Sequence, residues 1–564
     1  MRQVSIEPLR LAPGIASLRR IAQYRDDIAA VSAGLIAGII YFLTQTNRLT
    51  EDSVEYAAAA TRGGLEGLLH PHHLLFNPLL AAIYAVVGGS GATRQTLAMF
   101  QGLSILVSAV TIALVLLALR RMGCSLRVSS LLAAIFALGN GFWLYSSQIE
   151  VYNIAALCMI AAVAVSLIDG DIIATGRRAL PAAIFTTLAM LFHQTAIFFV
   201  LALLVYGLRT LPREARRGFV LRSILPPLAV VGALYVAATW SVLGSIAPGT
   251  VFWFATSYAH TGWWGGIEGM HFPKAIYGLA DTVLAIDNLR RVGVLGWGAM
   301  ALGVAGTVVA IRGLRAATKN GGASVRYLSF LIPWIIAHAA FVWWWYPSNI
   351  EFWIVLMPAL FLLAGSLLRS VAAGSGGERM VTMGLGLAMA GMLGVNAPGI
   401  LADHANENRR LSYSQEISSI SRSGDLFIST GQGALASYLR YFSPSKVLTV
   451  HGYCGVEAKT LGDRITDELI HRLELDMRGT IARNGRVLAE EGLLNGGIVT
   501  DRDLQHFDRA RFNQWVRALP WHAVEGSRGR IYMLTTTSDL SVHESNRSEI
   551  SLFHPCRYPG STGR

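Results

Sequence analysis

The sequence is dominated by apolar runs that are about as long as a membrane is thick. Hydrophobic residues fill 53% of the 564 positions and charged residues only 15%, whereas soluble domains carry charge at roughly a quarter of their positions. A helix of about 20 apolar residues crosses the hydrocarbon core of a bilayer. The chain has too little polar surface to enclose a water-soluble core of this size. It therefore predicts a mainly α-helical, polytopic membrane protein.

We expect about 11 membrane-spanning helices. The segments are 28–44, 96–119, 129–145, 153–168, 179–191, 196–208, 224–243, 292–311, 327–345, 352–368 and 381–397. A further apolar segment, 73–87, is short and interrupted by Asn77-Pro78, so we expect a helix that lies along or dips into the outer face.

Charge decides the fold of residues 179–208, which are too many for one span and too few for two full ones. Arg177 and Arg178 precede the run and several arginines follow it. Loops rich in arginine stay on the cytoplasmic side. Both ends should therefore be cytoplasmic, and we predict a short hairpin that turns on the outer side at His193-Gln194-Thr195.

The net charge of +12 has a similar explanation. Its arginines cluster in short loops between apolar runs, as the positive-inside rule requires. The sequence has no basic stripe with interleaved aromatic residues, which would indicate nucleic-acid binding. We expect an uncleaved cytoplasmic leader over 1–27 and a multi-pass protein of a bacterial-type inner membrane. The composition becomes polar near residue 400, which predicts a transmembrane domain over 28–399 and an extracytoplasmic domain over 400–564.

This C-terminal domain has the pattern of a small α/β fold. Residues 424–431 predict a strand that ends in a turn, 434–441 a helix and 446–450 a second strand. Gly431-Gln432-Gly433 lacks the full dinucleotide-binding fingerprint and indicates a structural turn. Cys454 and Cys556 either form a disulfide in an extracytoplasmic tail or remain two free thiols.

Ionisable residues gather at the predicted outer ends of the spans. Charge beside hydrocarbon is costly, so such residues need a partner or a function. The candidates are Asp52, Glu55, His70, His72 and His73 in the first outer loop, Glu150 and Tyr152 in the second, His193 at the hairpin turn, His260, Trp263, Trp264, Glu268, His271, Lys274, Arg290 and Arg291 in the fourth, and Asn349 and Glu351 after residues 343–346. Their placement on one side predicts a shared reaction site at the outer face.

Several of these residues also have a structural interpretation. Asp52 is a possible helix N-cap, and Glu55 fits a solvated helix face. His72 and His73 fit the lipid headgroup zone, and His193 fits a structural hydrogen bond. The aromatic residues 343–346 fit an interfacial belt. Glu150 differs, because it stands between two apolar spans with no cation near it in the sequence, so a buried partner or a function is expected.

Three motifs carry a resemblance to a known group. Asp52-Ser53-Val54-Glu55 followed by His70-Pro71 resembles the acidic first-loop motif of GT-C membrane glycosyltransferases. Phe142-Trp143 followed by Glu150-Val151-Tyr152-Asn153 resembles a motif of the branch related to protein O-mannosyltransferases. Phe192-His193-Gln194-Thr195 resembles the Asn-His-x-Thr turn of that branch, with Phe192 in place of Asn. The resemblance covers residues 28–208 well and fades beyond them, and His72-His73 departs from the Pro-Gly-Tyr-Pro-like sequence of the branch.

The resemblance implies transfer of a sugar from a polyprenyl-phosphate carrier to a hydroxyl of a glycan, lipid or protein acceptor at the extracytoplasmic face, with inversion. A carboxylate must take the proton of the attacking hydroxyl, and Asp52 is the expected base. Glu55 and Glu150 would orient substrate or hold a divalent cation, although metal-independent chemistry is favoured. The expected substrate-binding residues are His70, His72, His73, Tyr152, His193, Lys274, Arg290, Arg291 and Glu351.

Two other classes fit part of this pattern. A transporter or flippase of a lipid-linked glycan would place its charges along a midplane path, often in repeated halves. Here the charges gather at the outer ends of the spans, and the halves do not repeat. A non-catalytic membrane scaffold would tolerate replacement of Asp52, Glu55 and Glu150.

Overall fold

The computed structural model describes most of the chain, in several segments. They are residues 13–89, 91–166, 179–257, 265, 271–317, 325–371, 374–431, 433–450, 465–495, 507–524 and 531–534. The chain forms two compact units, each built from segments that are distant in the sequence. One, the helical unit, takes residues up to 46, 101–233 and 266–404. The other, the mixed unit, takes residues 47–100, 234–265 and those from 405 onward.

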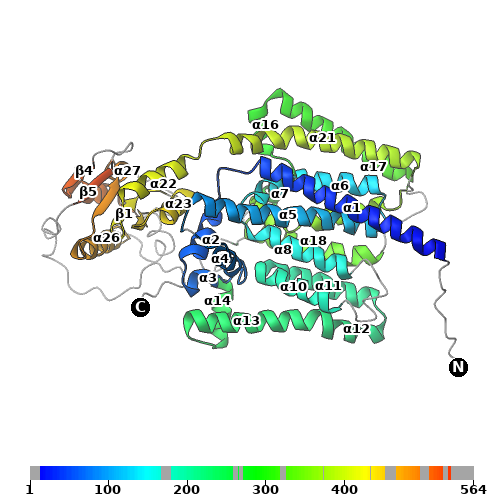
Figure 1. The fold of residues 1–564 in the computed structure, drawn as a ribbon, viewed down its shortest axis with the longest axis horizontal. Coiled ribbons are helices and arrows are strands. Elements are labelled where there is room, and N and C mark those ends of the chain that lie inside the picture. The colour runs from blue at the N-terminus through cyan, green and yellow to red at the C-terminus, as the bar shows by residue number, and fades with distance from the viewer. Residues whose placement is uncertain are drawn as a thin grey trace. The chain divides into compact units, whose positions relative to one another are not determined.

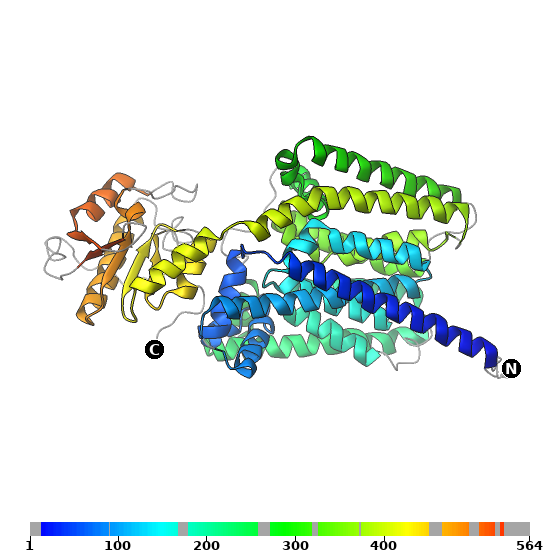
Figure 2. The ribbon, with the colours of Figure 1, turned by 45° about the horizontal axis from the view of Figure 1, so that its top comes forward.

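Long apolar helices make up most of the helical unit, and Figures 1 and 2 show them running side by side. The described helices of this unit, long and short, are α1 (Pro13–Leu43), α5 (Arg94–Arg121), α6 (Leu126–Leu138), α7 (Asn140–Ser146), α8 (Val151–Ser166), α10 (Ala179–Phe192), α11 (Ile197–Thr210), α12 (Arg213–Phe219), α13 (Leu225–Leu243), α15 (His271–Val283), α16 (Ile286–Val292), α17 (Val294–Ala317), α18 (Val325–Trp345), α19 (Ile350–Ile354), α20 (Met357–Leu368) and α21 (Gly376–Ala405). Helices α5 and α13 and the last residue of α21 extend into the mixed unit.

Within the described residues, seven helices are long and apolar enough to cross a membrane, or eight if one bent pair is counted as a span. The other predicted spans correspond to the shorter apolar helices α8, α10 and α11. The predicted fold class, a mainly helical polytopic membrane protein with a small mixed domain, is confirmed. The predicted domain boundaries at residues 27 and 399 separate water-exposed segments from membrane-embedded ones, whereas the two compact units are defined by packing within the chain. These boundaries therefore stay predictions.

The break between α10 and α11 falls where the hairpin turn was predicted. His193 leaves the helical conformation, with φ −155° and ψ 122°, and the 3-10 turn Gln194–Ala196 follows it. His193 lies beside Tyr152 at the start of α8, whereas Gly207, near the end of α11, packs against Phe219 of α12. This arrangement agrees with two short helices joined by a turn at His193.

A second break divides the predicted span 129–145 into α6 and α7, which meet at 66°. Gly141 lies so close to α15 that a Cβ atom there would stand 2.8 Å from the Thr282 methyl group. Asn396 of α21 holds the bend, since its amide nitrogen donates to the carbonyls of Leu138 and Val283 at 2.8 and 2.9 Å. Its oxygen accepts the Ala285 N–H at 2.8 Å. Backbone groups freed by a break in a buried helix need such partners.

The mixed unit contains short helices and a sheet. They are α2 (Glu51–Arg62), α3 (Leu65–Leu68), α4 (Phe76–Val87), α14 (Pro248–Thr256), α22 (Arg409–Ile420), β1 (Leu426–Ser429), α23 (Ala434–Phe442), β2 (Lys446–Thr449), α26 (Ile465–Ala482), β3 (Val487–Glu490), α27 (Glu491–Leu494), α28 (Arg509–Ala518), β4 (Trp521–Ala523) and β5 (Ile531–Leu534). The predicted strand, helix and second strand of the tail appear as β1, α23 and β2, and the short apolar helix predicted for 73–87 appears as α4.

The sheet has the order β2-β1-β3-β5-β4. Strand β1 is parallel to both β2 and β3, whereas β5 is antiparallel to β3 and β4. Because side chains alternate along a strand, Leu426 and Ile428 pack with α26 and α28 on one face, and Phe427 packs with α22 and α23 on the other. The sheet is therefore the middle of three layers, and the carboxyl ends of β1 and β3 lie next to each other.

Candidate functional site

Helix α2, in the first predicted outer loop, begins one residue before Asp52. Thr50 is its N-cap, and the Thr50 hydroxyl accepts the Ser53 N–H at 3.1 Å. The interpretation of Asp52 as the N-cap is therefore wrong. Asp52 is half-buried in the first turn, where the helix dipole stabilises a negative charge.

A histidine cluster lies beside α2. Asp52 and Tyr56 are four residues apart, so they share one side of the helix. The Tyr56 ring meets His73 edge-on at 4.7 Å, and the His73 ring stacks on His70 at 4.1 Å. Two of the predicted first-loop residues, His70 and His73, thus lie together, and His73 contacts α2 through Tyr56. The ring of His72 is also nearby, 5.6 Å from that of His70.

The protonation state of His70 follows from its surroundings. Its Nδ1 accepts the backbone N–H of His72 at 3.3 Å, which leaves the proton of the neutral ring on Nε2. Burial lowers the pKa of His70 to about 4. At neutral pH, the His70 ring is therefore uncharged.

Glu55 is turned toward the C-terminal part of the mixed unit. Its Oε1 accepts a hydrogen bond from the Ser437 hydroxyl at 3.0 Å and lies 3.6 Å from the Arg440 guanidinium. Burial raises the pKa of Glu55, while Arg440 and Ser437 act in the opposite direction. The fold thus joins Glu55 to α23, whereas Asp52 lies in the first turn of α2, on the side of the helix that also carries Tyr56.

A second cluster lies in the helical unit around Glu351. The Tyr145 hydroxyl donates to Oε2 of Glu351 at 3.3 Å, and the Asn349 amide donates to Oε1 at 2.7 Å. Asn349 also caps α19 by accepting the Glu351 N–H at 3.1 Å. Both oxygens of this buried carboxylate therefore have a donor, and its orientation is fixed.

Tyr152 and His193 belong to the same neighbourhood. The Tyr152 ring is 4.7 Å from the ring of His193 and meets Phe352, the neighbour of Glu351, edge-on at 5.7 Å. His193 Nδ1 lies 2.6 Å from the Thr195 hydroxyl, so the structural hydrogen bond considered for His193 is present. Glu150 precedes α8 directly and is only 1% exposed. The structure thus brings Tyr152, His193 and Glu351 together.

Sequence reasoning did not anticipate every member of this cluster. Tyr145 was expected only to end a span, yet it hydrogen-bonds Glu351, 206 residues away. Asn153 was expected to begin a span and to belong to a motif, and its amide also donates to Ser108 of α5 at 2.9 Å. Asn349, in contrast, was among the predicted residues, and an asparagine directly before a short acidic helix is typical of an N-cap.

The other predicted site residues are more dispersed. Lys274 is exposed on α15, and the buried His271 ring lies 6.0 Å from that of Trp343. Arg290 and Arg291 belong to α16, but their side chains are not among the described ones. Also outside the described residues are His260, Trp263, Trp264, Glu268, Cys454 and Cys556.

Among the side chains that the structure describes, no three His, Cys, Asp or Glu residues are grouped as ligands for a metal ion. The divalent cation considered from the sequence stays a prediction. The α2 cluster consists of Asp52 and Glu55 on helix α2 and the neighbouring residues His70, His72 and His73. It belongs to the mixed unit, whereas the Glu351 cluster belongs to the helical unit. A single site shared by both clusters therefore also stays a prediction.

No protein-family profile and no curated protein matches the sequence. Solved structures resemble the fold. ArnT from Cupriavidus metallidurans bound to undecaprenyl phosphate gives a TM-score of 0.54 at 12% identity, over 90% of this chain and 97% of that one. The Archaeoglobus fulgidus oligosaccharyltransferase in complex with zinc and sulfate gives 0.52 at 13% identity, over 83% and 69%. The same enzyme, tethered to an acceptor peptide containing the NVT sequon, gives 0.50 at 12% identity, over 91% and 75%.

At this level of identity the likeness shows the fold alone. The chain has the architecture of these membrane proteins, and the fold implied by the GT-C resemblance is confirmed. The O-mannosyltransferase-like branch stays a prediction.

Proposed function

We propose that this protein is a membrane glycosyltransferase that moves a sugar from a polyprenyl-phosphate carrier to a hydroxyl acceptor at the extracytoplasmic face. The observation that carries the proposal is the likeness to ArnT bound to undecaprenyl phosphate, which extends over nearly the whole length of both chains. The three sequence motifs add support, and Tyr152 and His193, which belong to two different motifs, lie in contact.

The proposed reaction is a single displacement. The acceptor oxygen attacks the anomeric carbon, the bond from that carbon to the phosphate oxygen breaks, and polyprenyl phosphate leaves with the bonding electrons. The proton of the acceptor hydroxyl passes to the carboxylate of Asp52, the general base. Asp52 suits this role because it is a carboxylate in the first turn of α2 that is half-buried and not enclosed. Attack from the side opposite the phosphate inverts the anomeric centre.

The leaving phosphate needs hydrogen-bond donors or positive charge. Neutral His70 supplies an N–H donor, and Lys274, Arg290 and Arg291 are the proposed cations. His72 and His73 would line the same region. Because the His70 pKa lies well below neutrality, its contribution would not change over the physiological pH range.

The buried cluster suits substrate orientation. Glu351 is held by two donors, and Tyr152 and His193 lie beside it. Together with Glu150, this cluster would accept hydrogen bonds from sugar hydroxyls and hold the ring in place. A rigid orienting group lowers the entropic part of the barrier.

The arrangement in the membrane is also part of the proposal. The arginine-rich loops favour a cytoplasmic N-terminus and an extracytoplasmic domain over 400–564. We place the protein in a bacterial-type inner membrane, with a glycan, lipid or protein as the acceptor.

The test is release of free polyprenyl phosphate from a panel of polyprenyl-phosphate sugars, with crude cell-envelope material as acceptor. The purified full-length protein should release it, and Asp52→Asn should lose this release while remaining folded. Glu66→Gln is the matched control, because it neutralises another carboxylate of the same loop, on α3.

Two results would count against the proposal. Absence of release with every donor would remove the transferase, and equal release by wild type and Asp52→Asn would remove Asp52 as the base. Movement of a labelled donor between leaflets without release would replace the transferase by a transporter.

A further inference from the structure

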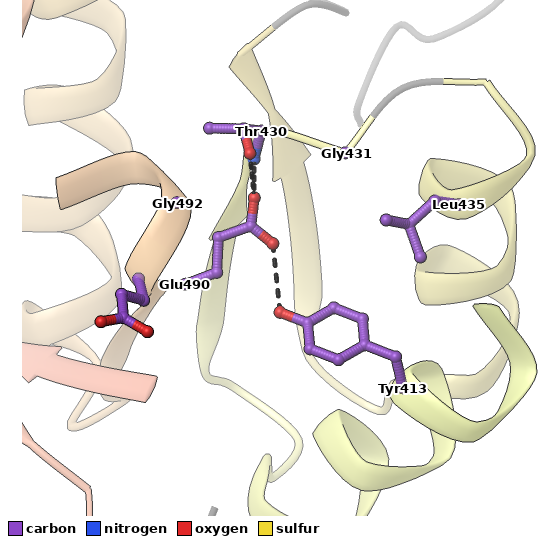
Figure 3. Close-up of a pocket in the computed structure, with 7 residues that line it drawn as sticks. Tyr413, Thr430, Gly431, Leu435, Glu490 and Gly492 are labelled. Carbon is purple, nitrogen blue, oxygen red and sulfur yellow. Dashed lines mark hydrogen bonds between the residues drawn. The ribbon is translucent and has the colours of Figure 1, made fainter. Parts of the chain in front are cut away.

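A pocket of about 330 Å³ opens in the C-terminal part of the mixed unit. Figure 3 shows it between the ends of β1 and β3 and the helices α22 and α23. Thr430 and Gly431 follow β1, Glu490 ends β3, and Tyr413 and Leu435 contribute from α22 and α23. None of these residues was assigned a role in the proposed transfer.

The topology explains why a crevice forms at this place. After β1 the chain enters α23, whose Leu439 packs on the Phe427 face of the sheet. After β3 it enters α27, whose Leu493 packs on the opposite face with Leu426. The two parallel strands are neighbours, so their outgoing connections diverge. Ligands of open α/β sheets bind at such a point, at the carboxyl ends of the strands.

Glu490 organises the polar side of the pocket. Its Oε2 accepts hydrogen bonds from the hydroxyls of Ser429 at 3.0 Å and Tyr413 at 3.1 Å. Its Oε1 accepts both the N–H and the hydroxyl of Thr430. The carboxylate thus has four donors and holds the β1 loop in place.

This network determines which ligands the pocket favours. The hydroxyl groups of Thr430 and Tyr413 donate their protons in hydrogen bonds to Glu490, so these two oxygens can act toward a ligand only as acceptors. Glu491 adds a second carboxylate, and the described residues that line the pocket include no Lys, Arg or His. Such a surface attracts groups that donate hydrogen bonds and repels anions.

The apolar side of the pocket and its small volume further restrict the class of ligand that fits. Figure 3 shows the Tyr413 ring and Leu435 facing the same space, which gives the pocket an apolar side opposite its acceptors. The volume lies at the small end of the range for ligand sites, which is roughly 300–1,000 Å³. We infer that this pocket binds a single non-anionic saccharide unit, whose hydroxyls donate to the oxygens and whose C–H face lies against Tyr413 and Leu435. The inference is drawn from the pocket alone and does not depend on the proposed transfer.

Two glycines keep the pocket open. A Cβ atom at Gly492 would lie 3.3 Å from the Thr430 hydroxyl oxygen, and one at Gly431 would lie 2.9 Å from that of Ser429. A methyl group at Gly492 therefore crowds one of the proposed acceptors. Gly479, within α26, provides a control, because a Cβ there would meet only the Arg483 guanidinium, at an ordinary 3.6 Å.

The experiment is saturation-transfer NMR on the full-length protein in nanodiscs, with the probes methyl glucopyranoside and glucuronate at about 10 mM. We expect a signal from methyl glucopyranoside and a much weaker one from glucuronate. Gly492→Ala should reduce the methyl glucopyranoside signal, and Gly479→Ala should leave it unchanged. Tyr413→Phe removes one acceptor and one donor to Glu490, and should weaken binding by about 2- to 10-fold.

Three outcomes would overturn the inference. They are absence of a methyl glucopyranoside signal, a signal unchanged by both Gly492→Ala and Tyr413→Phe, and binding of glucuronate as strong as that of the neutral sugar. If Gly492→Ala does not fold, Tyr413→Phe decides alone. Release of polyprenyl phosphate is measured separately, so failure of this site is distinguishable from failure of the proposed transfer.

Discussion

The α2 cluster and the Glu351 cluster differ in how completely the fold surrounds their carboxylates. Asp52 is half-buried and Glu55 is 30% exposed, whereas Glu351 is buried with a donor on each oxygen. A base that meets an incoming acceptor has to be reachable, while a group that orients a sugar benefits from being fixed. In the proposed mechanism, the half-buried Asp52 takes the proton and the enclosed Glu351 positions the substrate.

The strongest test of this comparison is neutralisation of the accessible carboxylate. Asp52→Asn should lower kcat by about 100- to 10,000-fold, the usual contribution of a general base, with little change in KM or thermal stability. Steady-state release of polyprenyl phosphate, compared with that of Glu66→Gln, measures the effect. A loss in KM with kcat preserved would assign Asp52 to binding instead.

The enclosed carboxylate should show its main effect in stability. Glu351→Ala leaves the Tyr145 hydroxyl and the Asn349 amide without their acceptor, and each unsatisfied group costs about 1–3 kcal/mol. Thermal unfolding in nanodiscs should show this loss, with a smaller one for Glu351→Gln, which keeps one acceptor oxygen. Unchanged unfolding of Glu351→Ala would show that the cluster is not held as described.

Glu55 should give a smaller and pH-dependent effect. Its raised pKa means that the folded state favours the protonated form, so its contribution to stability falls as pH rises through the titration range. Glu55→Gln should therefore be equal to wild type or slightly more stable at pH 7.5, by less than about 1 kcal/mol. The difference should vanish near pH 4. A clear destabilisation at pH 7.5 would show that the ion pair with Arg440 outweighs burial.

His70 should give the smallest effect, because its pKa of about 4 keeps it neutral. Between pH 5 and 8 the profile of kcat/KM should have the same shape in wild type and His70→Gln, whatever the difference in absolute rate. The folded state should lose stability only as pH falls from the unfolded value of His, about 6.5, toward 4. A step near pH 6.5 that is present in wild type and absent from His70→Gln would contradict this assignment.

The long apolar helices could be predicted from the sequence because apolar character and arginine placement are local properties. The same holds for the turn at His193 and for β1, α23 and β2. Strands β3, β4 and β5 were not predicted. Each has at most four residues, and β3 is defined by pairing with β1, about sixty positions earlier.

The candidate residues were predicted by type, but not by partner. The motif containing Asp52 and Glu55 gave no indication that Glu55 would accept a hydrogen bond from Ser437 of α23, because Ser437 is 382 residues away. Nor did it show that Thr50, and not Asp52, would cap α2. The bend between α6 and α7 was missed although Gly139-Asn140-Gly141 is a turn signal. Its hydrogen-bond partner Asn396 is 258 residues from Leu138 and could not be predicted from the sequence.

The role of Asn396 has a consequence for biosynthesis. The carbonyls of Leu138 and Val283 are synthesised well before the amide that they share, and domains of a growing chain fold progressively from the N-terminus. Until α21 arrives, those carbonyls have to use water or non-native partners, because an unsatisfied backbone group in hydrocarbon is costly. The final geometry of the α6–α7 bend would then be set late, and a ribosome-bound chain that ends before residue 396 should expose this region to protease or thiol labelling more than the complete protein does.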